Sequence, residues 1–202
     1  MYVNKIVISL LLILFTGSLL AQKTKRERLP RRKPSFVLHL GGGMSHYTGN
    51  INIQSIGLPG SISRNSFAGT ARLMWYPRYR LRLGIETGFS NFYSYNVKNG
   101  NINGKVNLQA IPLLVVWSMQ VVPRLNIFAG FGSYRLNTHL DYAGKVDSWS
   151  WVLGSNLAVS YTLPVSKRMG IAAEAKWMNA FESKDAALSM QFQMVYKLFQ
   201  WD

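Results

Sequence analysis

After the first 34 residues, apolar and polar positions alternate with a period of two in eight separate segments of the chain. A period of two places successive side chains on opposite faces of a β-strand, whereas a helix repeats its apolar positions every three or four residues. No segment after Pro34 keeps the helical repeat for long. The pattern therefore predicts an all-β fold of eight strands, at residues 36–44, 67–75, 81–89, 106–116, 124–136, 149–161, 169–177 and 188–198.

The two faces of these predicted strands differ in composition. In the first strand, for example, Leu38 and Leu40 alternate with His39 and Gly41. Small residues with a few charges suit the crowded interior of a narrow barrel, and an apolar face with aromatic residues near the strand ends suits contact with lipid. The sequence therefore predicts an antiparallel transmembrane β-barrel, with its apolar face outside and its polar face inside.

The fourth strand is the least clean, because residues 111, 113, 115 and 117 are apolar as well as the even-numbered positions between them. By analogy with the other strands, we take the even-numbered residues of 106–116 as the apolar face. Lys105, Asn107 and Gln109 are then expected on the polar face, inside the barrel.

The connections between the predicted strands support the same fold. Segments 47–64, 94–104 and 137–147 are long and mostly rich in Asn, Gly and Ser, whereas 77–79, 119–124 and 162–168 are shorter and most contain proline. Long outer loops that alternate with short periplasmic turns are typical of outer-membrane barrels. The expected fold is thus an eight-stranded antiparallel up-and-down barrel at residues 35–202, in the outer membrane and surrounded by its lipid.

The N-terminal 34 residues have a different character. Residues 1–21 have the pattern of a cleaved export signal, in which Lys5 precedes an apolar run and Ala21 offers a cleavage site; an uncleaved anchor is the alternative. Residues 22–34 hold seven cations, one anion and two prolines, which predicts an extended basic arm in the periplasm. The arm is either a disordered spacer or a docking arm for an acidic surface.

Charge and composition narrow the function. The chain has 23 Lys plus Arg against 8 Asp plus Glu, a net charge of +15. Such an excess is common in nucleic-acid-binding proteins, but export makes nucleic acid a poor partner. The absence of Cys excludes disulfides and thiolate metal sites, and no motif predicts a cofactor.

The cations gather in the arm and in the short turns, which predicts a basic collar at the periplasmic rim. An acidic periplasmic protein, peptidoglycan carboxylates or anionic lipid headgroups would complement it. The basic collar consists of Lys23, Lys25, Arg26, Arg28, Arg31, Arg32, Lys33, Arg78, Arg80, Arg124, Lys167 and Arg168.

Five charged residues in mid-strand fall on the inner face by parity: Arg72, Arg82, Glu86, Glu174 and Lys176. A buried ion needs a partner, so we expect a network of salt bridges in the lumen. The interior of an eight-stranded barrel is just filled by side chains, so this network should plug the barrel. A substrate tunnel is the minor alternative.

The three histidines are the candidates for catalysis. A lipid A-modifying barrel enzyme needs a Ser–His–acid or His-centred site near the outer leaflet. His39 is expected inside the barrel, His46-Tyr47-Thr48 is a poor match to the His-x-Ser pattern, and His139 is expected in a loop near Asp141. We therefore predict no catalytic residue, and keep a lipid A-modifying enzyme as the alternative function.

Short motifs in the predicted strands resemble a known group of proteins. Residues 109–115 (QAIPLLV) and 125–134 (LNIFAGFGSY) together resemble paired strands of the PorT-like outer-membrane barrel families of Bacteroidota. Residues 41–50 (GGGMSHYTGN) are similar to the first strand of a related group that includes PorG-like components of type IX secretion. The resemblance implies a small outer-membrane barrel and a role in a type IX-like secretion apparatus. From the basic collar and the lack of a catalytic pattern, we expect this barrel, of OmpA or OmpX size, to act without catalysis as an anchor or interaction module.

Overall fold

The computed structural model describes residues 33–49, 60–78, 80–99, 102–141, 145–183 and 185–201. The predicted signal at 1–21 and almost all of the basic arm at 22–34 lie outside these residues. The described residues contain no helix that is long and apolar enough to cross a bilayer.

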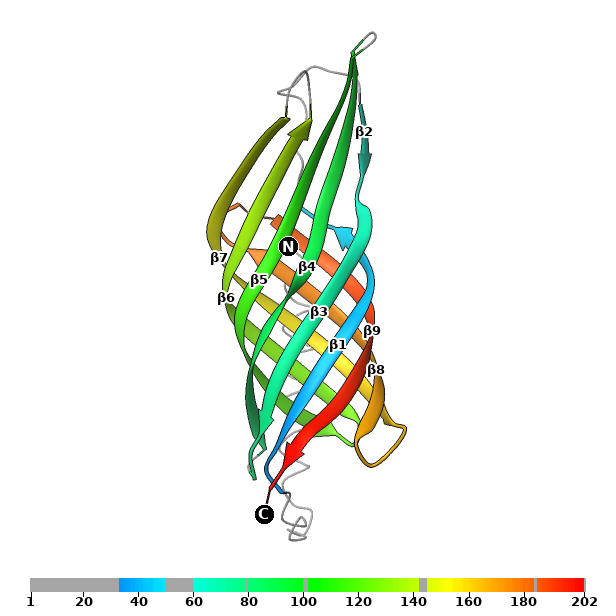
Figure 1. Cartoon of the computed structure of the whole chain (residues 1–202), viewed down its shortest axis with the longest axis vertical. Coiled ribbons are helices and arrows are strands. Elements are labelled where there is room, and N and C mark those ends of the chain that lie inside the picture. Colours follow the sequence, from blue (N-terminus) through cyan, green and yellow to red (C-terminus); the bar gives the residue numbers. More distant parts are fainter. Residues whose placement is uncertain are drawn as a thin grey trace, which may run out of the picture. The chain divides into compact units, whose positions relative to one another are not determined.

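Eight long strands of the described chain form a closed antiparallel barrel, in which neighbours in sequence are neighbours in space and β1 pairs with β9 (Figure 1). The predicted fold class is confirmed. A short additional strand, β2, pairs with the upper part of β4. The strands are β1 (Ser35–Tyr47), β2 (Gly60–Ser63), β3 (Asn65–Tyr76), β4 (Leu81–Asn99), β5 (Ile102–Val122), β6 (Leu125–Asp141), β7 (Lys145–Pro164), β8 (Met169–Ala180) and β9 (Asp185–Gln200).

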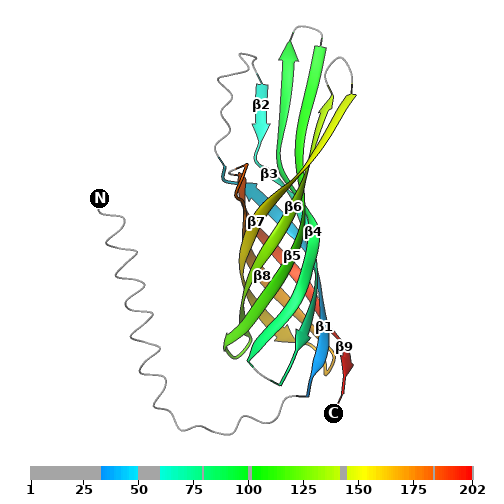
Figure 2. The same cartoon turned by 90° about the vertical axis from the view of Figure 1, so that its left-hand side faces the viewer.

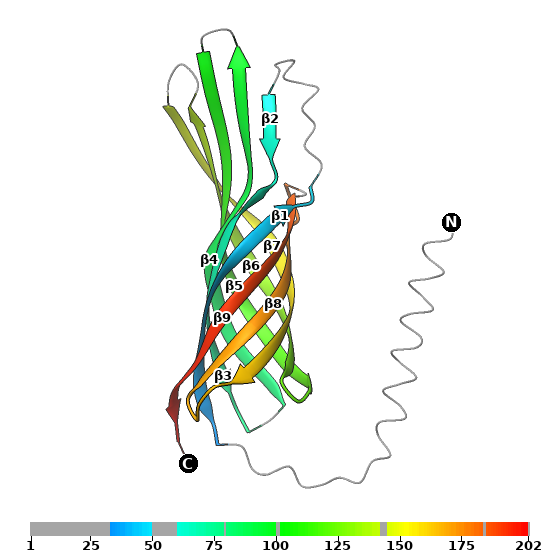
Figure 3. The same cartoon turned by 90° about the vertical axis from the view of Figure 1, so that its right-hand side faces the viewer.

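Some strands extend farther than others at one end of the barrel. At one end, which we call the hairpin end, β4 to β7 extend as two tall hairpins well beyond β1, β8 and β9 (Figures 2 and 3). The pairing of β7 with β8 stops at Gly154 and Ala180, so the rest of β7 toward Lys145 pairs with β6 alone. At the other end, the turn end, short turns join β3 to β4, β5 to β6 and β7 to β8.

The tall hairpins correct part of the sequence prediction. Residues 94–104 and 137–147 were expected to be loops, but 94–99, 102–104, 137–141 and 145–147 are strand. Main-chain hydrogen bonds hold these strands together, with Ser94 opposite Asn107 and His139 opposite Asp147. Such a ladder needs no apolar face, so the polar composition that suggested loops does not prevent strand pairing.

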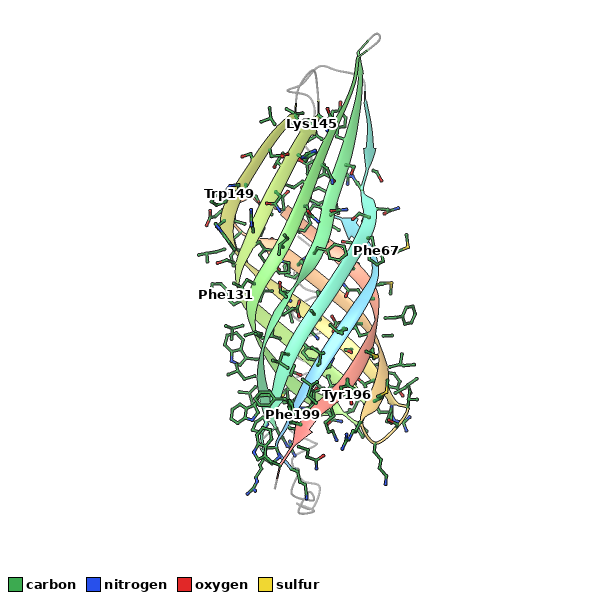
Figure 4. The ribbon with its side chains drawn as sticks, in the orientation of Figure 1. Phe67, Phe131, Lys145, Trp149, Tyr196 and Phe199 are labelled. Atoms are coloured by element: carbon green, nitrogen blue, oxygen red, sulfur yellow. The ribbon has the colours of Figure 1, made fainter. Side chains whose placement is uncertain are left out.

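The outer face of the barrel carries a wide apolar belt. Its side chains include Met190 and Phe192, which are 71% and 75% exposed, and aromatic residues such as Trp75, Trp117 and Trp177. Phe67 and Phe131 project outward higher on the barrel, with Tyr196 and Phe199 near the turn end (Figure 4). Exposed apolar surface of this extent requires lipid around it, so the barrel spans a membrane.

The predicted apolar face is the outer face on every barrel strand except β5. There the even-numbered residues point inward: Leu108, Leu114 and Val116 are buried in the lumen, whereas Leu113 and Trp117 are exposed outside. Asn107 and Gln109 therefore lie on the outer face, and their expected place inside the barrel was wrong. With apolar residues on both faces, the strand's own pattern does not define its orientation.

Candidate functional site

Four charged side chains meet at the centre of the lumen, and we call them the lumen ion cluster: Arg72 (β3), Glu86 (β4), Glu174 and Lys176 (both β8). Arg72 Nε donates to Glu86 Oε2 at 2.5 Å, and its two terminal nitrogens donate to the Glu174 carboxylate at 2.8 and 3.1 Å. Lys176 Nζ lies 2.7 Å from Glu86 Oε1 and 3.3 Å from Glu174 Oε1. Two cations thus neutralise two carboxylates.

The strand register explains how the cluster assembles. Arg72 and Glu86 face each other directly across the β3–β4 pair. Glu174 and Lys176 are two residues apart on β8 and therefore share its inner face. Because β3 and β4 lie across the narrow lumen from β8, the two pairs close into one cluster.

Neighbouring polar groups complete the hydrogen bonds of the cluster. Lys176 Nζ donates to Thr70 Oγ1, and Asn156 Nδ2 donates to Glu86 Oε1, each at 2.8 Å. The Arg72 guanidinium carbon lies 4.0 Å from the centre of the Phe128 ring. Charged groups in a low-dielectric interior need such complete pairing, and here they receive it.

Arg82, the fifth residue expected in this network, has other partners. It lies four residues from Glu86 along β4, toward the turn end. Its guanidinium donates to Asn126 Oδ1 at 2.8 Å and Gln120 Oε1 at 3.1 Å, and it stacks 4.1 Å from the Tyr76 ring centre. The inward direction of Arg82 was predicted correctly, but the structure does not place it among the four residues of the cluster.

Large apolar side chains fill the lumen beside the cluster, and the sequence interpretation missed them. Phe92, Phe128 and Tyr134 are fully buried and pack with Leu114 in one core. Phe128 could have been found by parity, because it lies between Asn126 and Gly130 on the predicted inner face. The lumen thus holds a packed apolar core as well as the lumen ion cluster, and Phe128 contacts both.

The basic collar occupies the turn end wherever the structure describes it. Arg78, Arg80, Arg124, Lys167 and Arg168 are all exposed in the three turns, and Lys33 is exposed at the start of the described chain. The collar residues Lys23, Lys25, Arg26, Arg28, Arg31 and Arg32 lie outside the described residues. Acidic residues of the described chain are elsewhere: Glu86 and Glu174 in the lumen, and Asp141, Asp147, Glu182 and Asp185 at the hairpin end.

A cavity of about 280 Å³ at the turn end adds a cation that the prediction missed. Lys33, Arg168 and Lys197 line it together with Phe199 and Gln200. The backbone N–H of Lys197 donates to the carbonyl of Arg168 at 2.8 Å, which brings these two cationic residues together. Lys197 is distant from the turns in sequence, so the turn pattern gave no signal for it.

The three histidines lie in separate places of the described structure, with His39 buried in the lumen 3.2 Å from the Tyr76 hydroxyl. His46 Nδ1 lies 2.6 Å from Asn65 Oδ1 on the outer surface. His139 is in strand β6, not in a loop, and it pairs with Asp147 instead of Asp141. Ser148 follows Asp147 and so points to the opposite face of the sheet. Among the described residues, no group of His, Cys, Asp and Glu could hold a metal ion.

Comparisons with known proteins support the fold alone. No family model and no curated protein matches the chain. The crystal structure of Ail, the attachment invasion locus protein of Yersinia pestis, in complex with the heparin analogue sucrose octasulfate, has a TM-score of 0.51 at 6% identity, over 82% of this chain and 99% of that chain. A major outer membrane protein from Thermus thermophilus has a TM-score of 0.51 at 12% identity, with the same coverage. This chain therefore has the fold of an eight-stranded outer-membrane β-barrel.

Proposed function

We propose that this protein is a non-catalytic integral protein of the outer membrane, an anchor or interaction module whose basic collar binds an acidic periplasmic protein. Segregation of charge carries the proposal. Exposed Arg and Lys side chains surround the turn end, whereas the described acidic residues lie in the lumen or at the hairpin end. Short turns face the periplasm in outer-membrane barrels, so the collar would face it here.

The collar is suited to a partner rather than to internal stability. Arg78 and Arg80 in one turn, and Lys167 and Arg168 in another, are exposed. Like charges within about 10 Å repel one another at moderate ionic strength, so an acidic partner that approaches them gains from several cations at once. A strongly salt-dependent association follows from this arrangement.

The packed lumen supports a static role in the membrane. The four charges of the lumen ion cluster are at most 3% exposed, and Phe128 and Tyr134 are fully buried beside them. A solute that entered the barrel would have to separate these ion pairs, at a cost of several kcal/mol. We therefore propose neither a diffusion pore nor a substrate tunnel.

Cross-linking from the turn end in native outer membranes tests the collar. The chain contains no Cys, so Ser166→Cys in the β7–β8 turn provides a unique thiol for a photo-cross-linker. We expect capture of an acidic periplasmic protein. Capture should fall at least fivefold in a variant with Arg78, Arg80, Lys167 and Arg168 all changed to Gln, and also when residues 23–33 are deleted.

A matched variant distinguishes the loss of collar cations from a general loss of positive charge. Arg64→Gln with Lys145→Gln removes cations from the hairpin end and should leave capture unchanged. All variants should keep the heat-modifiable gel migration of a folded barrel. Equal capture by the fourfold variant would contradict the proposal, and capture of only peptidoglycan fragments or anionic lipid would assign the collar to those partners instead.

Membership of a type IX-like secretion apparatus is a second proposal, supported by the resemblance of residues 109–115 and 125–134 to PorT-like barrels. Deletion of the gene should then remove a set of proteins from the culture medium, which comparison of the two secretomes would show. We propose no lipid A modification, because His46 and His139 lack the arrangement that it needs. Mass spectrometry of lipid A should accordingly give the same species with the wild-type protein, with His46→Ala and without the protein.

A further inference from the structure

The outer surface of the tall β5–β6–β7 sheet changes from apolar to polar over a short height. Residues that face one another across the three strands form rows, and alternate rows share the outer face. Successive outer rows are about 5 Å apart along the membrane normal, given a rise of about 3.3 Å per residue and a tilt of about 40°. From the belt upward the outer rows are Leu113–Ser133–Leu153, Ile111–Arg135–Trp151, Gln109–Asn137–Trp149 and Asn107–His139–Asp147.

The upper two rows border a cavity of about 410 Å³, which we call the ribbon patch: Asn107, Gln109, Asn137, His139, Asp147 and Trp149. Its size is in the range of small-ligand sites, about 300–1,000 Å³. Trp149 is 61% exposed there and lies on the outer side of the sheet above Phe131 (Figure 4). Trp149 shares its row with two carboxamides, on Gln109 and Asn137, and a polar row lies above it. An indole that is so exposed in polar surroundings keeps a large apolar surface open to a ligand.

The exposure of Trp151 and the exposure of Trp149 have different explanations. Trp151 shares its row with Ile111 and continues the aromatic girdle at the edge of the apolar belt. Trp149 is one row higher, opposite Asn137, and the Arg135 guanidinium lies 5.5 Å from its ring centre. A position beyond the belt, among carboxamides, is not that of a lipid-facing residue.

The chemistry of the patch fits a saccharide. Three carboxamides, on Asn107, Gln109 and Asn137, line one cavity and carry both donors and acceptors, although Asn107 Oδ1 already accepts from Ser94 Oγ at 3.0 Å. Sugar hydroxyls need both kinds of partner at close spacing, and the C–H face of a sugar ring can cover an indole. His139 and Asp147 pair with each other, so the only other charge that lines the cavity, among the described residues, is Arg135. That composition favours recognition of sugar hydroxyls by hydrogen bonds over recognition of phosphates by charge.

We infer that the ribbon patch binds sugars of a glycolipid in the outer leaflet. The sugars are those of a lipid because the ribbon patch is continuous with the apolar belt. The patch begins one row above Trp151, at the height where the sugar headgroups of a glycolipid lie above its acyl chains. The acyl chains would lie against the belt and the sugars against Trp149. The inference rests on the proposed outer-membrane location and on the orientation that puts the hairpin end outside, but not on the proposed role of the basic collar.

Binding to glycolipids that differ only in their sugars tests the inference. The protein is placed in phospholipid nanodiscs and titrated with lipid A that carries core sugars, or with lipid A without them, and bound lipid is counted by native mass spectrometry. The wild-type protein should bind the sugar-bearing form at least fivefold more tightly. Trp149→Ala and Asn137→Ala should each abolish this preference.

Val146→Ala is the matched control, because Val146 is 57% exposed on the same sheet but faces its opposite side. It should keep the preference, and all variants should show heat-modifiable migration. Equal binding of both glycolipids by the wild-type protein, or a preference that survives Trp149→Ala and Asn137→Ala, would overturn the inference. Free core oligosaccharide should bind more weakly than the glycolipid; binding as tight as that of the glycolipid would assign the patch to soluble saccharides and overturn the choice of ligand.

Discussion

Arg72 holds two carboxylates, Glu86 and Glu174, that are 88 positions apart in the sequence, and it is fully buried between them. Replacing Arg72 with Met leaves two buried carboxylates that share Lys176. Removal of one partner from a buried ion pair costs about 3–5 kcal/mol, so the free energy of unfolding should fall by about that amount. Urea unfolding in phospholipid bilayers, followed by Trp fluorescence, measures the loss.

The double variant Arg72→Met/Glu174→Gln provides the internal check. It leaves Lys176 and Glu86 as a neutral pair and should recover part of the stability. Arg80→Met at the exposed turn should change the free energy of unfolding by less than about 0.5 kcal/mol. A loss below about 1 kcal/mol for Arg72→Met would contradict the structural importance of the cluster.

Two adjacent glycines in β1 make a second residue-scale prediction. A Cβ on Gly43 would clash with the carbonyl oxygen of Met190 and so would force the backbones of β1 and β9 apart. A Cβ on Gly42 would meet first the far end of the Phe67 ring, at 3.0 Å, and a side chain can move aside. Gly43→Ala should therefore lower the free energy of unfolding by about 1–3 kcal/mol, and Gly42→Ala by clearly less. Equal urea midpoints for the two variants would contradict this account.

At the scale of elements, the β5–β6 turn places an unusual demand on one residue. Pro123 and Arg124 alone connect Val122 to Leu125, and Arg124 has a φ of 73°. Side chains other than glycine cost about 1–2 kcal/mol in this left-handed region. Arg124→Gly should thus stabilise the barrel by about 0.5–1 kcal/mol, measured by the urea midpoint. Lys167→Gly, at a described turn residue without a positive φ, should not stabilise it.

The sequence predicted the strands and most of their faces, because alternation on one strand is enough to assign an inner and an outer side when only one face is apolar. It failed on β5, where Leu114 and Leu113 are equally suited to either side. Packing in the lumen determines which face of β5 points inward, because Leu114 packs there in one core with Phe128 and Tyr134.

The sequence does not predict which inner residues contact one another across the barrel. Parity placed Arg72, Arg82 and Glu86 inside, but it does not specify which inner residues stand at the same height. That depends on strand tilt and register around the whole barrel. Arg82 proved to be nearer the turn end, and Trp149 joined carboxamides from β5 and β6 that no local pattern connects to it.

At the scale of the molecule, the proposed orientation can be tested with single thiols. Val146→Cys is on a tall hairpin and Lys167→Cys is in a turn, and the native chain has no Cys to interfere. If the turns face the periplasm, a membrane-impermeant maleimide should label Val146→Cys in intact cells. It should label Lys167→Cys only after the outer membrane is permeabilised. The reverse result would place the basic collar outside the cell.

The lumen ion cluster also constrains how the barrel assembles. Arg72 and Glu86 come from an early hairpin and Glu174 and Lys176 from a late strand, with β1 and β9 between them on the short way round. An open sheet in the bilayer would expose the Arg72–Glu86 and Glu174–Lys176 pairs to hydrocarbon without the contacts that join the two pairs. A charged side chain at the midplane costs about 2.5–3.5 kcal/mol. Membrane insertion and the pairing of β1 with β9 are therefore coupled. Either these two strands join before the charged hairpin moves deep into lipid, or a chaperone shields the charged hairpin until they have joined.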